Sequence, residues 1–314
     1  MTDIVHQTLE AISVEQIRSH IKILQGVRHP VFAPGALDRA ADYIKNILES
    51  LSYEISEQLF IEDDHEYRNI IGLRRGSLYP EKRVVVLAHY DTMPETPGAN
   101  DNASGVAAML ELARVFQHLV FEASILFIGV SLEESKWGSK QQDAILDKTS
   151  TAILRGSRAL AAHAKANMWD ILGLIDFEEI AFASDSIIQE TINGLPFDLP
   201  KVGNFIGVIG NDNSAELVKG FIKSIESNHI SLPYVPLVVP GNGEVIPDTR
   251  RSDHAPFWDL GYKAIMVTDT ANLRTPHYHQ ASDTLETLNL DFAAEVCRAA
   301  GGLVIDMAGL ADAQ

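Results

Sequence analysis

The sequence predicts an α/β sandwich built on a largely parallel β-sheet. The 314 residues are 46% hydrophobic and 22% charged, with a mean hydropathy of +0.01, which is typical of a globular protein with a large core. Short apolar runs alternate along the chain with longer segments of helical spacing, as expected for parallel strands joined by helices. No composition break or linker divides the chain, so we expect a single domain over residues 1–314.

Residues 1–60 predict helices at 14–25 and 35–51, where apolar side chains such as Ile17, Ile21 and Leu24 recur every three or four positions. β-type runs follow at 53–60 and 68–74. The run at 84–88 is apolar throughout, which is typical of a strand covered on both faces. In chain order we then expect a helix at 103–118, a strand at 124–132, a helix at 157–165, strands at 171–177 and 205–210, a helix near 214–226, a strand at 264–269 and a helix near 291–309.

Charge and composition exclude several classes of protein. The formal net charge is −18, from 43 acidic and 25 basic residues, and a field of this sign repels nucleic acids and anionic membranes. No apolar stretch approaches the ~18 residues of a membrane span, and residues 1–20 lack the apolar core of a signal peptide. The single cysteine, Cys297, excludes an intramolecular disulfide and a paired-cysteine metal site. We therefore expect a cytoplasmic protein that binds neither nucleic acid nor membrane.

Polar residues that follow the predicted strands are candidates for chemistry, because functional groups gather at the carboxyl ends of parallel strands. His89 follows the strand at 84–88, and Asp91, two residues later, points to the same side and could orient its imidazole. Asp101 lies in a Gly/Asn/Ser-rich loop before a helix, where a capping role is the alternative. Glu133 and Glu134 end the strand at 124–132, where a solvated strand end is the alternative.

Two further candidates complete a possible metal site: Asp176, in the apolar segment LGLIDF, and His279, near the C-terminal helix. Nitrogen and oxygen ligands without thiolate favour zinc or another divalent ion of the first transition row. Five ligands exceed the needs of one tetrahedral zinc and suit two ions about 3.5–4 Å apart that share a carboxylate. The full set is His89, Asp101, Glu134, Asp176 and His279, and Glu133 remains free to act as the general base toward water.

These motifs resemble the di-zinc aminopeptidases of metallopeptidase family 28. The resemblance rests on AHYDT (88–92), PGANDNASGVAAMLELAR (97–114), the Glu133–Glu134 pair, LIDFEE (174–179), RSDHAPFWDLGYKAIMVTDT (251–270) and YHQASDTLETL (278–288), which occur in the order of that family. It implies a three-layer sandwich of the zinc exopeptidase type, with a mostly parallel, partly mixed sheet. It also implies a cis peptide bond after Asp101. The chain departs from the family pattern after the Glu133–Glu134 pair, where we expect an insertion at about 136–156 beside the active site.

The resemblance assigns a role to each candidate. His89 and Asp176 would hold one zinc ion, Glu134 and His279 the other, and Asp101 would bridge the two ions. Glu133 would be the catalytic base, Asp91 would orient His89, Tyr278 would donate a hydrogen bond to the oxyanion, and Arg251 would contact the substrate.

The expected function is therefore that of an exopeptidase, an aminopeptidase above all, acting on peptides or small amides through water activated by two zinc ions. The alternative with the same fold is a glutaminyl-cyclase-like acyltransferase with a single zinc ion, and metal stoichiometry separates the two. A metal-free binding or scaffold protein is a third interpretation, disfavoured because all the ligand positions are filled. The sequence is compatible with other first-row metals and with an oligomer.

Overall fold

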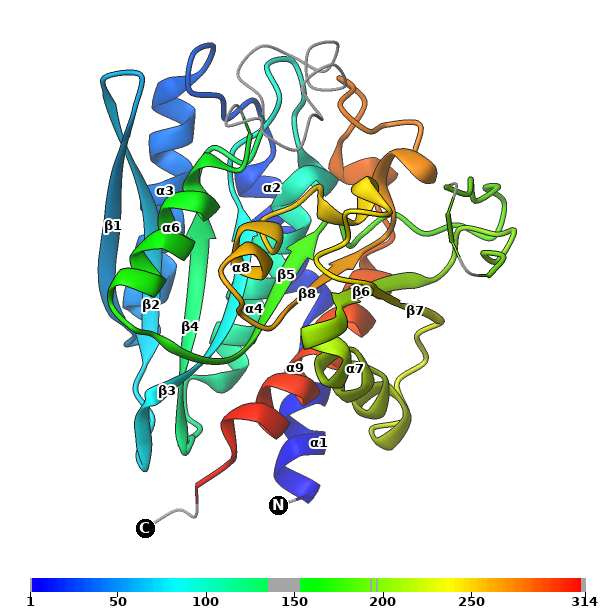
Figure 1. Cartoon of the computed structure of the whole chain (residues 1–314). Coiled ribbons are helices and arrows are strands. Elements are labelled where there is room, and N and C mark those ends of the chain that lie inside the picture. The colour runs from blue at the N-terminus through cyan, green and yellow to red at the C-terminus, as the bar shows by residue number, and fades with distance from the viewer. Residues whose placement is uncertain (1, 135–152, 193, 196, 312–314) are drawn as a thin grey trace.

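A mixed eight-stranded β-sheet forms the centre of the computed structural model, which describes residues 2–134, 153–192, 194–195 and 197–311 (Figure 1). The strand order is β1-β2-β4-β3-β5-β8-β6-β7. The strands are β1 (Glu54–Glu62), β2 (His65–Arg74), β3 (Tyr79–His89), β4 (Ala123–Val130), β5 (Asp170–Glu178), β6 (Ile206–Asn211), β7 (Tyr234–Val239) and β8 (Ala264–Thr268).

The middle of the sheet is parallel and its margins are mixed. Strands β4, β3, β5 and β8 run in the same direction, so their carboxyl ends lie at one edge of the sheet. The β1–β2 hairpin pairs antiparallel with β4, and β6 pairs antiparallel with β8 and parallel with β7. The predicted α/β sandwich with a mostly parallel, partly mixed sheet is therefore confirmed.

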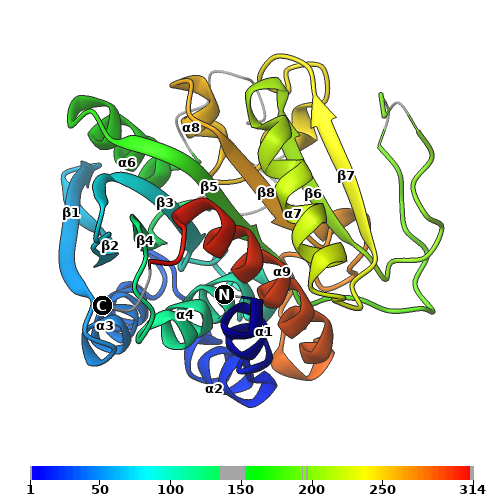
Figure 2. The same ribbon diagram turned by 90° about the horizontal axis from the view of Figure 1, so that it is seen from below.

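Helices cover both faces of the sheet, which makes three layers (Figure 2). One face carries α2 (Val14–Leu24), α3 (Pro34–Ser50), α4 (Gly105–Phe116), α7 (Ala215–Ser227) and α9 (Leu290–Ala308), with α1 (Thr2–Glu10) packed on α9 and α4. The other face carries α6 (Arg155–Ala166) and α8 (Ala255–Asp259).

The alternation of side chains along β3 shows how the two cores are separated. Val84, Val86 and Ala88 pack in the core beneath α4 and α9, whereas Val85 and Leu87 pack in the core beneath α6 and α8. Successive side chains of a strand point to opposite faces, so a strand covered on both faces must be apolar at every position. The continuous apolar run at 84–88 arises from this double burial.

Most predicted elements agree with the structure to within a few residues; among the α-helices and strands of the described residues, α1, α8 and β7 were not predicted. Strand β7 contains Pro236, which cannot donate a ladder hydrogen bond and is tolerated here because β7 is an edge strand. Of the insertion predicted at about 136–156, residues 136–152 lie outside the described residues. Among the described helices, none has both the length and the apolar character that a membrane crossing requires.

Candidate active site

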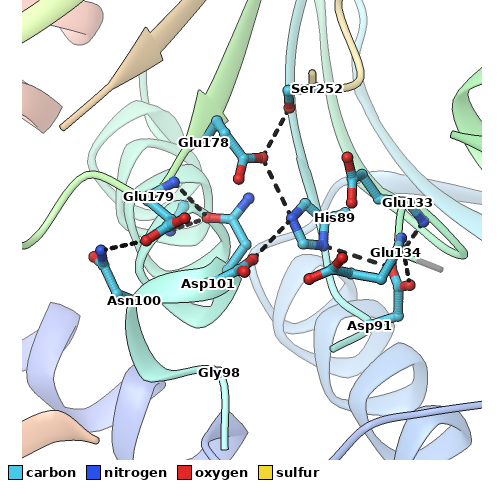
Figure 3. Close-up of polar contacts among 12 residues, drawn as sticks. His89, Asp91, Gly98, Asn100, Asp101, Glu133, Glu134, Glu178, Glu179 and Ser252 are labelled. Atoms are coloured by element: carbon cyan, nitrogen blue, oxygen red, sulfur yellow. Dashed lines mark hydrogen bonds and ion pairs between the residues drawn. The ribbon is translucent and has the colours of Figure 1, made fainter. Parts of the chain in front are cut away.

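The candidate site lies at the carboxyl ends of the parallel strands (Figure 3). His89 is the last residue of β3, and Glu178 is the last residue of β5. Glu133 and Glu134 follow β4, Asp101 precedes α4, and His279 lies in the loop between β8 and α9. Segments that are far apart in the sequence therefore place their side chains at one edge of the sheet.

Two groups of buried nitrogen and oxygen atoms meet at Asp101. In the first group, Nε2 of His89 lies 3.3 Å from Oδ1 of Asp101 and 3.3 Å from Oε2 of Glu178. In the second group, Nε2 of His279 lies 3.2 Å from Oδ2 of Asp101 and 3.2 Å from Oε1 of Glu134. Within each group the potential ligand atoms all lie within 4.8 Å of one another. Asp101 thus offers one carboxylate oxygen to each group.

One residue of the predicted ligand set is corrected by this geometry. The atoms that gather around His89 are those of Asp101 and Glu178, and Asp176 is not among them. The Oδ2 atom of Asp176 accepts the backbone N–H of His254 at 2.9 Å and lies 3.1 Å from Nδ1 of the His254 ring, while its Oδ1 has no hydrogen-bond partner. Glu178 takes the place that was expected for Asp176. Both side chains lie on the same face of β5, but Asp176 is two residues, or about 6.6 Å, further from the strand's carboxyl end.

Sequence reasoning missed Glu178, although a signal was present. The segment LIDFEE ends in adjacent carboxylates, Glu178 and Glu179, as the segment after β4 does. The rule that functional groups lie beyond the strand's carboxyl end favours the last acidic residues over the one inside the apolar run. Ser252 was missed as well: its hydroxyl donates a 2.8 Å hydrogen bond to Oε2 of Glu178 and so orients that carboxylate.

The loop that carries Asp101 is fixed by hydrogen bonds to distant segments. Both oxygens of Asp283 accept backbone N–H groups from this loop, from Asn100 at 2.8 Å and from Asp101 at 3.1 Å. The Asn102 side chain donates to the carbonyl of Phe177 in β5 at 2.6 Å. A Cβ at Gly105 would lie 2.4 Å from Oδ1 of Asn102, so only glycine fits there. The Asp101–Asn102 peptide bond is cis, as predicted.

Asp91 connects the carboxyl end of β3, which carries His89, with the segment after β4, which carries Glu133 and Glu134. A contact with His89 was expected from the spacing of the two residues. Its Oδ1 lies 3.5 Å from Nδ1 of His89. The same carboxylate accepts the backbone N–H of Glu133 at 3.1 Å and that of Glu134 at 3.0 Å. Burial acts to raise the pKa of Asp91, but His89 and the two N–H groups outweigh it and hold that pKa below its usual value. Asp91 is therefore an anion that orients three candidate site residues at once.

The remaining predicted residues line the same region. Glu133 is buried next to Glu134 and belongs to neither ligand group. The Tyr278 ring stacks on the imidazole of His279, with ring centroids 3.7 Å apart. The Tyr278 hydroxyl accepts a 3.0 Å hydrogen bond from Nη2 of Arg251. All the other predicted ligands and catalytic residues are thus brought together, and Asp176 alone is placed apart from them.

The two groups fit divalent cations. Among the buried polar atoms of the described residues, Nε2 of His89, Oδ1 of Asp101 and both carboxylate oxygens of Glu134 have no hydrogen-bond partner. Burial is the main cause that raises the pKa of Glu134 to about 7; His279 opposes this shift and the nearby Asp101 carboxylate adds to it. Buried carboxylates this close need a cation or a proton. Imidazole and carboxylate donors without thiolate suit zinc.

A largely apolar pocket adjoins the site. Glu178, Arg251 and Tyr278 contribute to its lining and connect it with the ligand groups. Its apolar lining consists of Ile192, Leu195, Phe197, Leu199, Phe205, Ile209, Val235, Leu237, Met266, Ala271 and Leu273. A pocket of this composition is suited to an apolar side chain held beside polar groups that fix its orientation.

Comparisons with curated proteins identify relatives of this chain. A family model described as peptidase family M28 matches residues 69–304. The uncharacterized protein YfbL of Escherichia coli K12 is 29% identical over 297 residues, which cover 90% of this chain and 85% of YfbL. A probable zinc metalloprotease of Leptosphaeria maculans is 26% identical over 230 residues, covering 68% of this chain and 48% of that protein. The chain thus spans about half the length of the fungal relative.

Solved structures share the fold at low sequence identity. The LapA aminopeptidase of Legionella pneumophila matches with a TM-score of 0.73 at 18% identity, covering 98% of this chain and 74% of LapA. A glutaminyl cyclase of Macrostomum lignano matches with a TM-score of 0.75 at 19% identity, covering 98% of this chain and 94% of the cyclase. These likenesses establish the fold, and the family model spans more than half of the sequence. The chain belongs to peptidase family M28.

Proposed function

We propose that this chain is a two-zinc aminopeptidase that removes the N-terminal residue of peptides or related small amides. The observation that carries the proposal is the position of Asp101, whose two carboxylate oxygens face different groups of buried donors. His89, Asp101 and Glu178 would hold one ion, and Asp101, Glu134 and His279 the other. When bound, the zinc pair would lower the pKa of a water molecule and polarise the carbonyl of the scissile amide.

Glu133 would carry out the proton transfers. Burial raises the pKa of Glu133 well above its usual value, and the neighbouring Glu134 carboxylate adds to this shift while His89 opposes it. A carboxylate with a raised proton affinity can take a proton from the attacking water. The same carboxyl group can then donate that proton to the departing amine, which leaves Glu133 ready for another cycle.

Tyr278 would stabilise the negative charge that develops on the substrate carbonyl oxygen. A guanidinium group can only donate hydrogen bonds, so the Tyr278 oxygen must accept the one from Arg251. The phenol proton is then free for another acceptor. A neutral donor aimed at the developing oxyanion lowers the energy of the transition state more than that of the substrate.

The apolar pocket supports a preference for large apolar side chains at the substrate's N-terminus, such as leucine, methionine or phenylalanine. The Arg251 guanidinium at its edge lies 3.5 Å from Oδ1 of Asp248, a contact that offsets part of its charge. An acidic substrate side chain would have to enter a pocket whose other residues are mainly apolar. A cytoplasmic location stays a prediction from the sequence.

The test combines metal analysis with a substrate panel. The purified protein should contain two zinc ions per chain, and a chelator should abolish its activity. Leucyl and phenylalanyl p-nitroanilides should be hydrolysed, and N-acetylated versions should not. One ion per chain together with conversion of N-terminal glutamine to pyroglutamate would replace the aminopeptidase by a glutaminyl cyclase. Hydrolysis of the acetylated substrates would contradict the requirement for a free N-terminus.

A further inference from the structure

Arg28 is a buried arginine whose guanidinium is bonded to backbone carbonyl groups. It lies between α2 and α3, and it is 2% exposed. Nε donates to the carbonyl of Tyr90 at 2.7 Å, and Nη2 donates to that of Gly98 at 3.0 Å. Nη1 donates to the carbonyls of Gly26 at 2.9 Å and Pro97 at 3.0 Å, and also to that of Leu24.

Three of these carbonyls, those of Tyr90, Pro97 and Gly98, belong to the two segments that carry His89 and Asp101 of the first ligand group. Tyr90 stands between His89 and Asp91, at the end of β3. Pro97 and Gly98 open the loop that leads to Asp101, as Figure 3 shows for Gly98. One guanidinium therefore joins the backbone that carries His89 to the backbone that carries the shared carboxylate.

We call the place where Arg28 joins the segment after β3 (residues 89–92) to the loop before Asp101 (residues 97–101) the junction. Further contacts at the Arg28 backbone and at Gly98 hold it together. The backbone nitrogen of Arg28 donates to Oγ1 of Thr92 at 2.9 Å, and its carbonyl accepts from the nitrogen of Thr92 at 3.1 Å. A Cβ at Gly98 would lie 2.9 Å from Nη2 of Arg28 and 2.4 Å from Cγ2 of Thr92. The close contacts therefore leave no room for a side chain at position 98.

A lysine could not reproduce this arrangement. Its ammonium is a point charge with three donors, whereas the planar guanidinium of Arg28 donates in several fixed directions at once. Burial lowers the pKa of Arg28 to about 10, while Asp283, Asp91 and Asp101 act to raise it, so the group stays charged at neutral pH. This cation also offsets part of the negative charge that the ligand carboxylates concentrate in the site.

We propose that Arg28 is a positioning residue that sets the spacing between His89 and the shared carboxylate of Asp101, and through it the affinity and geometry of the metal pair. The inference rests on the proposed two-zinc function. The competing explanation is a purely structural role, in which Arg28 caps the carboxyl end of α2 through Leu24 and Gly26. The two explanations differ in what a substitution does to metal binding in a chain that is still folded.

The experiment compares Arg28→Lys with Arg274→Lys. Arg274 is a suitable control because it is 4% exposed, donates to the carbonyl of Phe182 and to Gln189, and contacts neither segment of the junction. Stepwise zinc affinities are measured by competition with a chromogenic chelator, and cobalt-loaded samples give a visible absorption spectrum that reports ligand geometry. Circular dichroism establishes that each variant is folded.

We expect Arg28→Lys to weaken zinc binding at one of the two sites by about tenfold or more and to change the cobalt spectrum, as loss of a group that orients ligands does. Arg274→Lys should bind both ions as the wild type does. A folded Arg28→Lys chain with wild-type affinities and spectrum would overturn the inference and leave the two-zinc proposal intact. Equal losses in the two variants would also overturn it, as a general effect of removing a buried arginine. A wild-type chain that binds fewer than two ions would overturn the proposed function itself.

If Arg28→Lys does not fold, Thr92 decides the question. Thr92→Val removes the acceptor for the Arg28 backbone N–H, whereas Thr92→Ser keeps it. We expect severalfold weaker zinc binding in the valine variant and wild-type binding in the serine variant. Equal zinc binding by the two variants would refute the positioning role.

Discussion

Replacement of Asp91 by asparagine tests how the two strand ends are held together. The substitution keeps the size of the side chain and removes one acceptor oxygen and the negative charge. In the wild type, the two oxygens accept the backbone N–H groups of Glu133 at 3.1 Å and Glu134 at 3.0 Å. Asparagine has one carbonyl oxygen, so its amide group must face one of those donors.

The expected loss follows from these contacts. One backbone N–H, buried among residues that are almost inaccessible to water, would lose its acceptor, which costs about 1–3 kcal/mol in the free energy of unfolding. His89 would also lose the carboxylate that lies 3.5 Å from its Nδ1. Losses of such orienting groups typically weaken metal binding by about 10–100-fold.

Urea denaturation of the metal-free protein measures the first effect, and zinc titration measures the second. Asp64→Asn is the matched control, because Asp64 is exposed in the turn between β1 and β2. The control should change stability by no more than about 0.5 kcal/mol and leave zinc affinity unchanged. An Asp91→Asn chain with the stability and the zinc affinity of the wild type would refute the role given to Asp91.

Three further predictions concern the base, the oxyanion and acid stability. Glu133→Gln should lower kcat by about 10²–10⁴-fold while two zinc ions stay bound, whereas Glu134→Gln should lose zinc. Normal turnover by Glu133→Gln would show that another residue is the base. Tyr278→Phe should lower kcat by about 10²–10³-fold with little change in KM, and an unchanged kcat would exclude it as the oxyanion donor. Burial, with a contribution from Arg114, lowers the pKa of His20 to about 4, so the unfolded chain binds a proton at His20 below pH 6.5 that the folded chain excludes. His20 should therefore contribute about 2 kcal/mol to the loss of stability from pH 7 to pH 5, so the loss should be about that much larger in the wild type than in His20→Gln, as measured by urea denaturation at both pH values. An equal change in both proteins would exclude this role of His20.

The sequence predicts the sheet and most of its strands because burial on both faces leaves a local signal. Strand β3 is apolar at each position from 84 to 88, and the residue after that run is His89, so the strand and its functional end are visible together. The edge strand β7 is half exposed and contains Pro236, and it therefore lacks that signal.

The choice between Asp176 and Glu178 shows where local reasoning fails. Both residues lie on one face of β5, so a period of two does not distinguish them. What separates them is the distance to His89, which depends on the pairing of β5 with β3, where Leu87 lies opposite Asp176. Glu178 is therefore the residue that reaches past the strand end to His89.

Contacts between distant segments leave no pattern in a single sequence. Asp283 holds the backbone of Asn100 and Asp101 across more than 180 positions of the chain, and Arg28 donates to Pro97 and Gly98 across about 70. An aspartate before a helix and an arginine after one are common residues in common places. Their roles become visible only when the fold brings the segments together.

The most direct test of the two-metal centre is anomalous X-ray diffraction from crystals of the zinc-loaded protein, collected at the zinc absorption edge. We expect two peaks per chain, one among His89, Asp101 and Glu178 and the other among Asp101, Glu134 and His279. A single peak per chain would contradict the shared-carboxylate centre. A peak bound by Asp176 in place of Glu178 would contradict the ligand assignment on which the proposed function is built.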